Sequence, residues 1–372
     1  MQMTFQEEFQ RSWLTSILGF LIFVVGVYLL VWNEGEIVHH HHSLEETFNN
    51  AITLNPFEKL QPEYEGRVVH IMGDLKVDEP LTELEYGISI QAVKLKRRVQ
   101  MYQWVEEQSS SNVNDETDYQ STRDYYYVTE WRDKLVDSSS FYIRTGHENP
   151  TQKPLETVIY TAPSVRLGPL TLNSEIKDKF TEFEEVTSDE RPDRPDVKLH
   201  LGIYYHCKDV WNPEVGDIRI QFYYAGPTGE PITIIAKQEK NILVPYTTSK
   251  GHQVALLRNG NLNIDEMFRA EHWDVKVSAW KLRIYGAFLI YFGVICWSKL
   301  LKLIFNQIPM LTDIISGEAI DGRNCFLAGS IALFVIALAW VLHRPVLGMS
   351  LIFVAVSPLL YGVTGVYGGP PN

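Results

Sequence analysis

Apolar runs with uncharged centres lie towards both ends of the chain, and a long polar segment separates them. The first run, residues 13–32, is about as long as the 20 apolar residues that a helix needs to cross a bilayer. It is too long for the core of a cleaved signal peptide, and no small-residue cleavage site follows it. Trp13, Tyr28 and Trp32 near its ends are typical of the aromatic belt at a membrane surface. The pattern therefore predicts an uncleaved transmembrane helix.

Three further apolar runs follow the polar segment, and they predict transmembrane helices over 282–305, 324–342 and 346–363. The last two are near the lower length limit, and the sequence His-Arg-Pro between them is typical of a helical hairpin turn. We therefore expect an α+β membrane protein. Four transmembrane helices, one N-terminal and three C-terminal, accompany a large β-rich extramembrane domain over 33–279, between the first and second helices.

Small residues within the apolar runs permit close approach of helices. They are Gly19, Gly26, Ala328, Gly329 and Ala332. They serve packing within the chain or contacts between copies, and the pattern leaves both open. The interior of each run carries no ionisable residue, which disfavours a transporter or a channel formed by one chain.

Alternation of apolar and polar positions predicts antiparallel strands in the polar segment. It is clearest over 86–107, where Val93, Leu95 and Val99 fall on one face and basic and aromatic residues on the other. A strand over 125–131 follows a polar loop and is expected to pair with it. Further strands are expected over 66–75 with a turn near Gly73, and over 155–162, 197–206, 216–226 and 232–238, the last two joined by a hairpin loop.

Helices are predicted at three places beside these strands. Ser43 and Glu46 have the spacing of a capping box, so a short helix is expected to begin at Leu44 and end before Pro56. A surface helix is expected over 173–183. A further helix, capped by Asn263, is expected to lead into the second membrane run, and a short interfacial helix over 308–315 is possible by pattern.

Charge and cysteine content exclude some functions for the polar segment. It holds 26 Lys and Arg against 41 Asp and Glu, a net charge of −15. This charge argues against binding nucleic acid or anionic lipid headgroups by charge, and it leaves a local basic patch open. Cys207 is its only cysteine, so no disulfide forms within it. The basic residues around the membrane runs are too evenly divided to set the orientation.

Histidines are the most conspicuous candidates for chemistry. The run His39–His42 lies just after the first membrane helix, but four adjacent residues cannot converge on one metal ion. We expect a solvated linker there, with a pH-dependent contact to lipid headgroups as the alternative. His200 and His206 fall on one face of an expected strand beside Cys207, as ordinary strand histidines or as part of a zinc site.

Catalytic motifs for serine hydrolases, zinc proteases, phosphate-binding loops and dithiol chemistry are missing from the sequence. We therefore expect no enzyme and no cofactor. The basic and aromatic face of the long strand is the candidate surface for a ligand or partner. Its residues are Lys94, Lys96, Arg98, Tyr102 and Trp104.

Several blocks together resemble the LUMA family, also called the transmembrane protein 43 family. They are EGRVVHIMGDL, AVKLKRRVQMYQWVE, TEWR, GHENP and PEVGDIRIQFYYAG, in order along the chain. The agreement extends from Asn33 to Pro345. Residues of these blocks also have structural explanations in turns, aromatic packing and ion pairs. Those singled out are Gly66, Gly73, Glu130, Trp131, Gly146, Pro150, Gly216, Asp217 and Gly226.

The resemblance implies a multi-pass protein of the endoplasmic reticulum and inner nuclear membrane, with a luminal domain and with cytosolic or nucleoplasmic termini. It implies a scaffold that maintains nuclear membrane organisation, that binds emerin and lamins and that associates with itself. A lipid- or small-ligand-sensing membrane module, or a channel or junction component, is the alternative.

Overall fold

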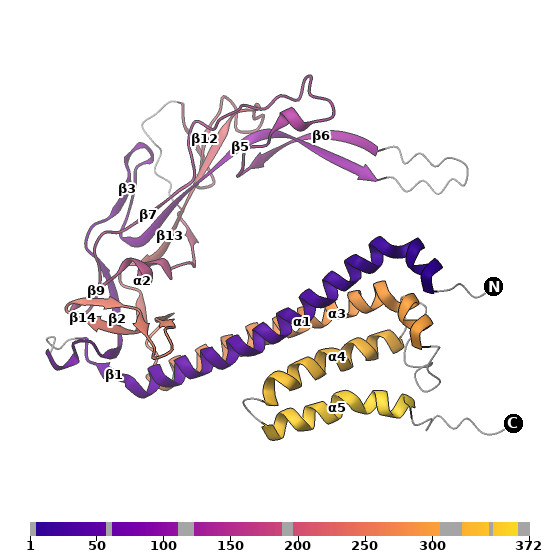
Figure 1. Ribbon diagram of the computed structural model, residues 1–372. Coiled ribbons are helices and arrows are strands. Elements are labelled where there is room, and N and C mark those ends of the chain that lie inside the picture. The colour runs from indigo at the N-terminus through magenta and orange to yellow at the C-terminus, as the bar shows by residue number, and fades with distance from the viewer. Residues whose placement is uncertain are drawn as a thin grey trace. The chain divides into compact units, whose positions relative to one another are not determined.

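The computed structural model describes residues 5–56, 62–110, 123–187, 196–305, 322–341 and 345–363. It divides into two compact units, which we call the helical unit (1–48 and 265–372) and the β unit (49–264). The β unit is narrower than the expected domain over 33–279. The difference arises because the helices before and after it continue well past the apolar runs (Figure 1).

In the described part of the helical unit there are two long helices and two shorter ones (Figure 1). They are α1 (Phe5–Asn50), α3 (Ile264–Phe305), α4 (Gly322–Val341) and α5 (Pro345–Val363). Within the described residues, α1, α3 and α4 are long and apolar enough to cross a membrane, whereas the apolar stretch described in α5 is shorter. The mixed α+β membrane fold is confirmed, and a fourth crossing stays a prediction. The expected interfacial helix over 308–315 lies outside the described residues.

Helix α1 is continuous through His39–His42, so the expected linker and the helix start at Leu44 are wrong. A capping serine needs a non-helical backbone, but Ser43 is helical, and its hydroxyl is buried without a partner in the described part of the chain. The reason is tertiary packing, because Leu44 and Thr47 are buried in the helical unit and the Phe48 ring meets that of Phe268 edge-on. This burial outweighs the local capping signal. The four histidines remain exposed on the helix.

Antiparallel α1 and α3 are joined along a seam of glycines spaced seven residues apart. A Cβ at Gly286 would lie 2.7 Å from Leu30, and one at Gly293 would lie 2.7 Å from Phe23. Gly19 and Gly26 meet the same face of α3 from the other side. The backbones therefore approach as closely as only glycine allows. Packing within the chain, which the sequence left open for Gly19 and Gly26, is how the structure uses them.

The β unit contains two large sheets and two small hairpins. In the first sheet the pairings run β2–β8–β9–β15–β14 and return to β2, which closes a ring around an apolar core. Strand β1 pairs in parallel with β2, and β18 pairs with β14. Its strands are β1 (Ala51–Leu54), β2 (Val68–Val77), β8 (Val165–Leu167), β9 (Leu170–Leu172), β14 (Pro231–Glu239), β15 (Ile242–Val244) and β18 (Leu256–Asn259).

The second sheet is built on the long strand β5, which pairs with β13 on one edge and with β6 and β7 along the other parts of its length. The predicted pairing of 125–131 with this strand is confirmed. Its members are β5 (Ala92–Ser110), β6 (Arg123–Arg132), β7 (Val158–Thr161), β10 (Glu184–Glu185), β11 (Lys198–His200), β12 (Ile203–His206) and β13 (Ile218–Pro227). The small hairpins are β3 (Leu81–Glu83) with β4 (Ile88–Ile90), and β16 (Tyr246–Thr247) with β17 (Gln253–Val254).

Three predictions in the β unit placed or omitted turns wrongly. Gly73 lies inside β2 opposite Ile232 and makes no turn. Residues 197–206 form two strands, because Leu201 and Gly202 turn with positive φ. The loop 228–230 joins no hairpin, because β13 pairs with β5 while β14 pairs with β2, and the loop carries the chain from one sheet to the other.

The helix expected over 173–183 is shortened to α2 (Ser174–Asp178), which Asn173 caps by accepting from the N–H of Ile176. After it the chain turns inwards and buries Phe180. The ring of Phe180 packs where Gly226 leaves room, since a Cβ there would lie 2.6 Å from the ring. Position 226 therefore requires glycine for two reasons, its positive φ of 64° and the close packing of Phe180.

Candidate functional site

The basic and aromatic face of β5 makes many contacts within the chain. Lys94 Nζ donates to the carbonyl of Asp178 at 3.0 Å and is itself almost buried. Lys96 Nζ lies 5.5 Å from the ring centroid of Phe183. Arg98 donates two hydrogen bonds to the Asp133 carboxylate, at 2.6 and 2.7 Å. These bonds hold the pKa of the Asp133 carboxyl below its usual value. Each of the three cations thus makes a contact within the folded β unit.

The aromatic residues of this face are likewise held. The Tyr102 hydroxyl lies 2.8 Å from the Thr129 hydroxyl, and its ring packs on Trp131. The Trp104 ring meets His147 edge-on. A role for Lys94, Lys96, Arg98, Tyr102 and Trp104 as a partner surface stays a prediction.

The family-motif residues of the β unit occupy turns and packing positions. Gly66, Gly146, Gly216 and Gly226 all have positive φ. Pro150 lies 3.4 Å from where a Cβ would stand at Gly216. A set of polar contacts accompanies them: Glu130 pairs with Arg132 at 2.8 Å, Arg219 stacks on Trp131, and the Asp217 carboxylate accepts from the N–H of Glu214. Gly73 alone among the motif glycines is an ordinary strand residue.

The strand histidines do not share a face. His200 packs edge-on against Trp211, whereas His206 is bonded through Nε2 to the Tyr86 hydroxyl at 3.1 Å. Burial raises the pKa of the nearby Cys207 thiol. No group of three or more metal-ligating side chains is found among the described residues.

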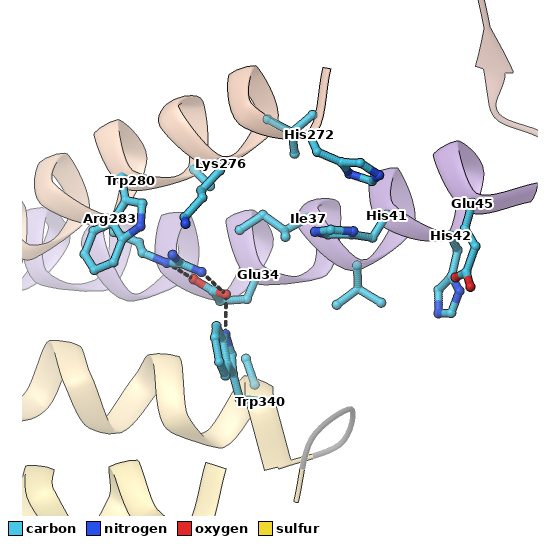
Figure 2. Close-up of a pocket in the computed structure, with 14 residues that line it drawn as sticks. Glu34, Ile37, His41, His42, Glu45, His272, Lys276, Trp280, Arg283 and Trp340 are labelled. Atoms are coloured by element: carbon cyan, nitrogen blue, oxygen red, sulfur yellow. Dashed lines mark hydrogen bonds and ion pairs between the residues drawn. The ribbon is translucent and has the colours of Figure 1, made fainter. Parts of the chain in front are cut away.

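A buried ion pair joins the three apolar helices of the helical unit. Arg283 of α3 donates to both carboxylate oxygens of Glu34 of α1, at 2.6 and 2.8 Å. The indole N–H of Trp340 of α4 donates to the same carboxylate at 2.6 Å. Glu34 is only 3 % exposed and Arg283 11 %. Figure 2 shows the three side chains meeting between their helices. A charge buried so deeply requires such partners.

This cluster closes one end of a cavity of about 740 Å³, which we call the charged pocket. Its lining combines apolar, aromatic and titratable side chains from α1, α3 and α4. They are Glu34, Ile37, Val38, His41, His42, Glu45, His272, Val275, Lys276, Ala279, Trp280, Arg283, Ala339 and Trp340. A pocket of this size and mixture matches sites for small molecules or lipid headgroups.

Two histidines form part of its wall. The rings of His41 and His272 stack with centroids 4.9 Å apart (Figure 2). Nδ1 of His272 is buried and has no hydrogen-bond partner in the described part of the chain. Two of the four histidines of the run His39–His42, His41 and His42, thus line a pocket. Both come from the helix that replaced the expected linker.

Sequence reasoning did not find this site. In the sequence Glu34 is only the first charge after one apolar run, and Arg283 is only a basic residue at the edge of another. Their opposite charges at matching ends of two antiparallel helices were the available signal. Trp340 carried none, because a tryptophan near a helix end is also the usual mark of a membrane surface.

Comparisons with known proteins agree with the motif blocks. A family model described as Transmembrane protein 43 matches residues 101–345. The chain is 44 % identical to the Transmembrane protein 43 homolog of Drosophila melanogaster, over 95 % of this chain and 96 % of the relative. It is 31 % identical to Transmembrane protein 43 of Homo sapiens, over 94 % of this chain and 89 % of the relative. The chain belongs to the transmembrane protein 43 family. No solved structure matches it.

Membership of the transmembrane protein 43 family makes this a membrane protein, and tryptophans lie near the ends of its apolar runs. From Trp13 to Trp32 α1 rises about 28 Å, and from Trp280 to Trp297 α3 rises about 25 Å. Both lengths approach the hydrocarbon thickness of about 30 Å. Trp32 and Trp280 lie at the end that also carries the ion pair. The charged pocket therefore opens at this end of the apolar helices.

Proposed function

We propose that this member of the transmembrane protein 43 family is a multi-pass scaffold of the endoplasmic reticulum and inner nuclear membrane. In this proposal it maintains nuclear membrane organisation by binding other membrane and lamina proteins, emerin and lamins among them, and by self-association. The β unit lies in the lumen, and the termini lie in the cytosol or nucleoplasm. The family is not known as an enzyme family, which agrees with a non-catalytic role.

The observation that best supports a binding role is an exposed apolar patch on the β unit. Leu201 is 82 % exposed and Trp211 is 80 % exposed. The two lie close together, because His200, beside Leu201, packs against the Trp211 ring with centroids 5.0 Å apart. We call His200, Leu201 and Trp211 the hairpin patch. Large exposed apolar groups of this kind are typical of protein contacts, where tryptophan is often the anchor.

The backbone at Leu201 strengthens this interpretation. Its φ is 50°, in the left-handed region that a branched side chain rarely adopts. The neighbouring Gly202 also has positive φ, which costs a glycine no strain. A large hydrophobic residue held outward on a strained turn costs stability in the free protein, and a contact made by that side chain would offset the cost.

Proximity labelling in cells tests the proposal. A biotin ligase fused to the N-terminus should label emerin, lamins or other nuclear-envelope proteins, and a ligase inserted in the β unit should label luminal domains of membrane proteins. A neighbour list without nuclear-envelope proteins would contradict the scaffold role.

The hairpin patch is tested with the double variant Leu201→Ser/Trp211→Ser. It should lose luminal neighbours while it keeps its membrane insertion. Leu84→Ser is the matched control, since Leu84 is 88 % exposed elsewhere on the β unit. Equal neighbour lists for the patch variant and the control would remove the patch from the proposal.

A further inference from the structure

We infer that the charged pocket binds the anionic phosphate headgroup of a membrane phospholipid, with Lys276 as the residue that contacts the phosphate. This inference concerns the helical unit alone. It does not depend on the proposed scaffold role or on the hairpin patch, and it goes beyond both by assigning a ligand to a specific site.

The first argument is the level of the pocket along the helices. Its α1 residues, from Glu34 to Glu45, follow Trp32, and its α3 residues end at Arg283, three residues past Trp280. The aromatic belt marks the boundary between hydrocarbon and headgroups. The pocket thus spans the boundary between hydrocarbon and headgroups, and Lys276, which precedes Trp280 on α3, lies on the headgroup side of that boundary.

The second argument is charge. The Arg283 guanidinium is neutralised by Glu34, with which it shares two hydrogen bonds. Lys276 adds a positive charge beside this neutral pair, and Figure 2 shows its side chain directed into the space between α1 and α3. Its ammonium lies 5.8 Å from the ring centroid of Trp273. An ammonium that is exposed at headgroup level attracts anionic lipid.

The other titratable groups of the lining do not cancel the positive charge of Lys276. Glu45 lies beside His42 at the far end of the pocket, away from Lys276 (Figure 2). The stacked rings of His41 and His272 stand between the two ends and offer ring N–H donors. The end closed by the ion pair is therefore positive, and the phosphate is expected there, where Lys276 and the indole of Trp280 both line the pocket.

The third argument distinguishes a lipid from a free anion. Besides its cation, the pocket has an apolar wall made by Ile37, Val38, Val275, Ala279 and Ala339. A free phosphate gains nothing from these side chains. A phospholipid places its phosphate against Lys276, and its glycerol and first acyl carbons reach Ala279 and Ala339, which lie on the membrane side of Lys276, so that both the charge and the apolar surface are satisfied.

Native mass spectrometry of the full chain in a neutral detergent tests this inference. The protein is mixed with equal amounts of phosphatidic acid and phosphatidylcholine with the same acyl chains. The wild type should retain phosphatidic acid in preference, and Lys276→Gln should weaken this retention about tenfold, as expected for the loss of one charge-assisted contact. Lys276→Arg, which keeps the charge, should retain most of it.

Lys281→Gln is the matched control, because Lys281 is exposed on the same helix but does not line the pocket. It should behave as the wild type does. The inference is overturned if Lys276→Gln retains as much phosphatidic acid as the control, or if the wild type retains phosphatidylcholine equally well. Displacement of the lipid by millimolar inorganic phosphate would assign the site to free phosphate and would overturn the lipid assignment.

Discussion

At the scale of single residues, the most informative group is the trio of Glu34, Arg283 and Trp340. A carboxylate, a guanidinium and an indole N–H from three helices satisfy one another at 2.6–2.8 Å. Taking either charge out of water costs several kcal/mol, which the partner offsets only while the geometry holds. The trio therefore selects one arrangement of α1, α3 and α4.

Replacement of one member should be costly. Glu34→Gln removes the charge that compensates Arg283, and we expect it to lower the free energy of unfolding of the helical unit by about 3–5 kcal/mol. Denaturant titration of the purified protein in detergent measures this value. Glu36→Gln is the control, since Glu36 is 39 % exposed and lies 3.4 Å from His40 on the helix surface.

The double variant Glu34→Leu/Arg283→Met separates charge from packing. It should recover most of the stability lost in Glu34→Gln, because no unpaired charge is left in the buried site. A double variant as unstable as the single one would show that packing, and not the uncompensated charge, dominates.

A second residue-scale prediction concerns pH and His70 in the β unit. His70 is 1 % exposed, and its Nε2 donates to the carbonyl of Leu262 at 3.0 Å while its Nδ1 accepts from Thr53 at 3.2 Å. Burial lowers the pKa of His70 below 6.5, although the bond to Leu262 acts in the opposite direction. The folded protein therefore holds His70 neutral at a pH where the unfolded chain already binds a proton.

The sign of the effect follows from this difference. Stability is complete above about pH 6.5 and falls as pH decreases from there to the pKa of the folded state, by at most about 1.4 kcal/mol per pH unit. The thermal midpoint of the β unit in the full chain, compared at pH 7.5 and 5.5, should drop more for the wild type than for His70→Gln. The same drop in both would assign the acid sensitivity to other groups.

At the scale of elements, α1 and α3 show how backbone contact replaces side-chain packing. Gly19 and Gly26 on one helix face Gly293 and Gly286 on the other, so each pair brings main chain to main chain. In a membrane, lipid tails compete for apolar side chains, and helix association depends on such close packing.

Gly293→Val should separate α1 from α3, because a Cβ at this position would lie 2.7 Å from Phe23 and 3.0 Å from the carbonyl oxygen of Gly19. We expect a loss of about 1–3 kcal/mol, typical of overpacking. Cysteine cross-linking between the two helices should lose efficiency along with it.

Gly329→Val on α4 is the matched control, since no atom of the described residues lies within 4 Å of the place that its Cβ would take. It makes the same chemical change in another apolar helix. Equal losses from Gly293→Val and Gly329→Val would contradict the seam as the cause.

At the scale of the whole molecule, the two ends of the chain form the helical unit, and the middle of the chain forms the β unit. The helices continue past the membrane runs, so α1 leads directly into β1 at Ala51 and α3 begins at Ile264. Because α1 and α3 are antiparallel, both connections to the β unit leave from the same end of this helix pair.

The side that the β unit occupies can be tested with a glycosylation sequon. An Asn-x-Thr introduced within residues 111–118, between β5 and β6, should be glycosylated in cells if that unit is luminal. A sequon in an N-terminal extension should stay unmodified. Modification of the N-terminal site alone would reverse the proposed orientation.

Short-range patterns in the sequence determined several helices, one long strand and the family of this protein. The apolar runs predicted the helices α1, α3 and α4, because burial in lipid depends on composition and length alone. Alternation over 86–107 predicted the half-buried strand β5 and its pairing with β6, because one side chain in two must face the core. The motif blocks were enough to identify the family.

Only the tertiary structure decided which residues meet at long range. It paired Glu34 with Arg283 across 249 positions, sent β13 and β14 into different sheets, and kept α1 helical through its histidines. In each case a local signal, such as the capping box at Ser43, was weaker than contacts with distant parts of the chain. Hairpin and capping signals are worth about 1 kcal/mol each, whereas the burial of several side chains in a packed interface contributes more.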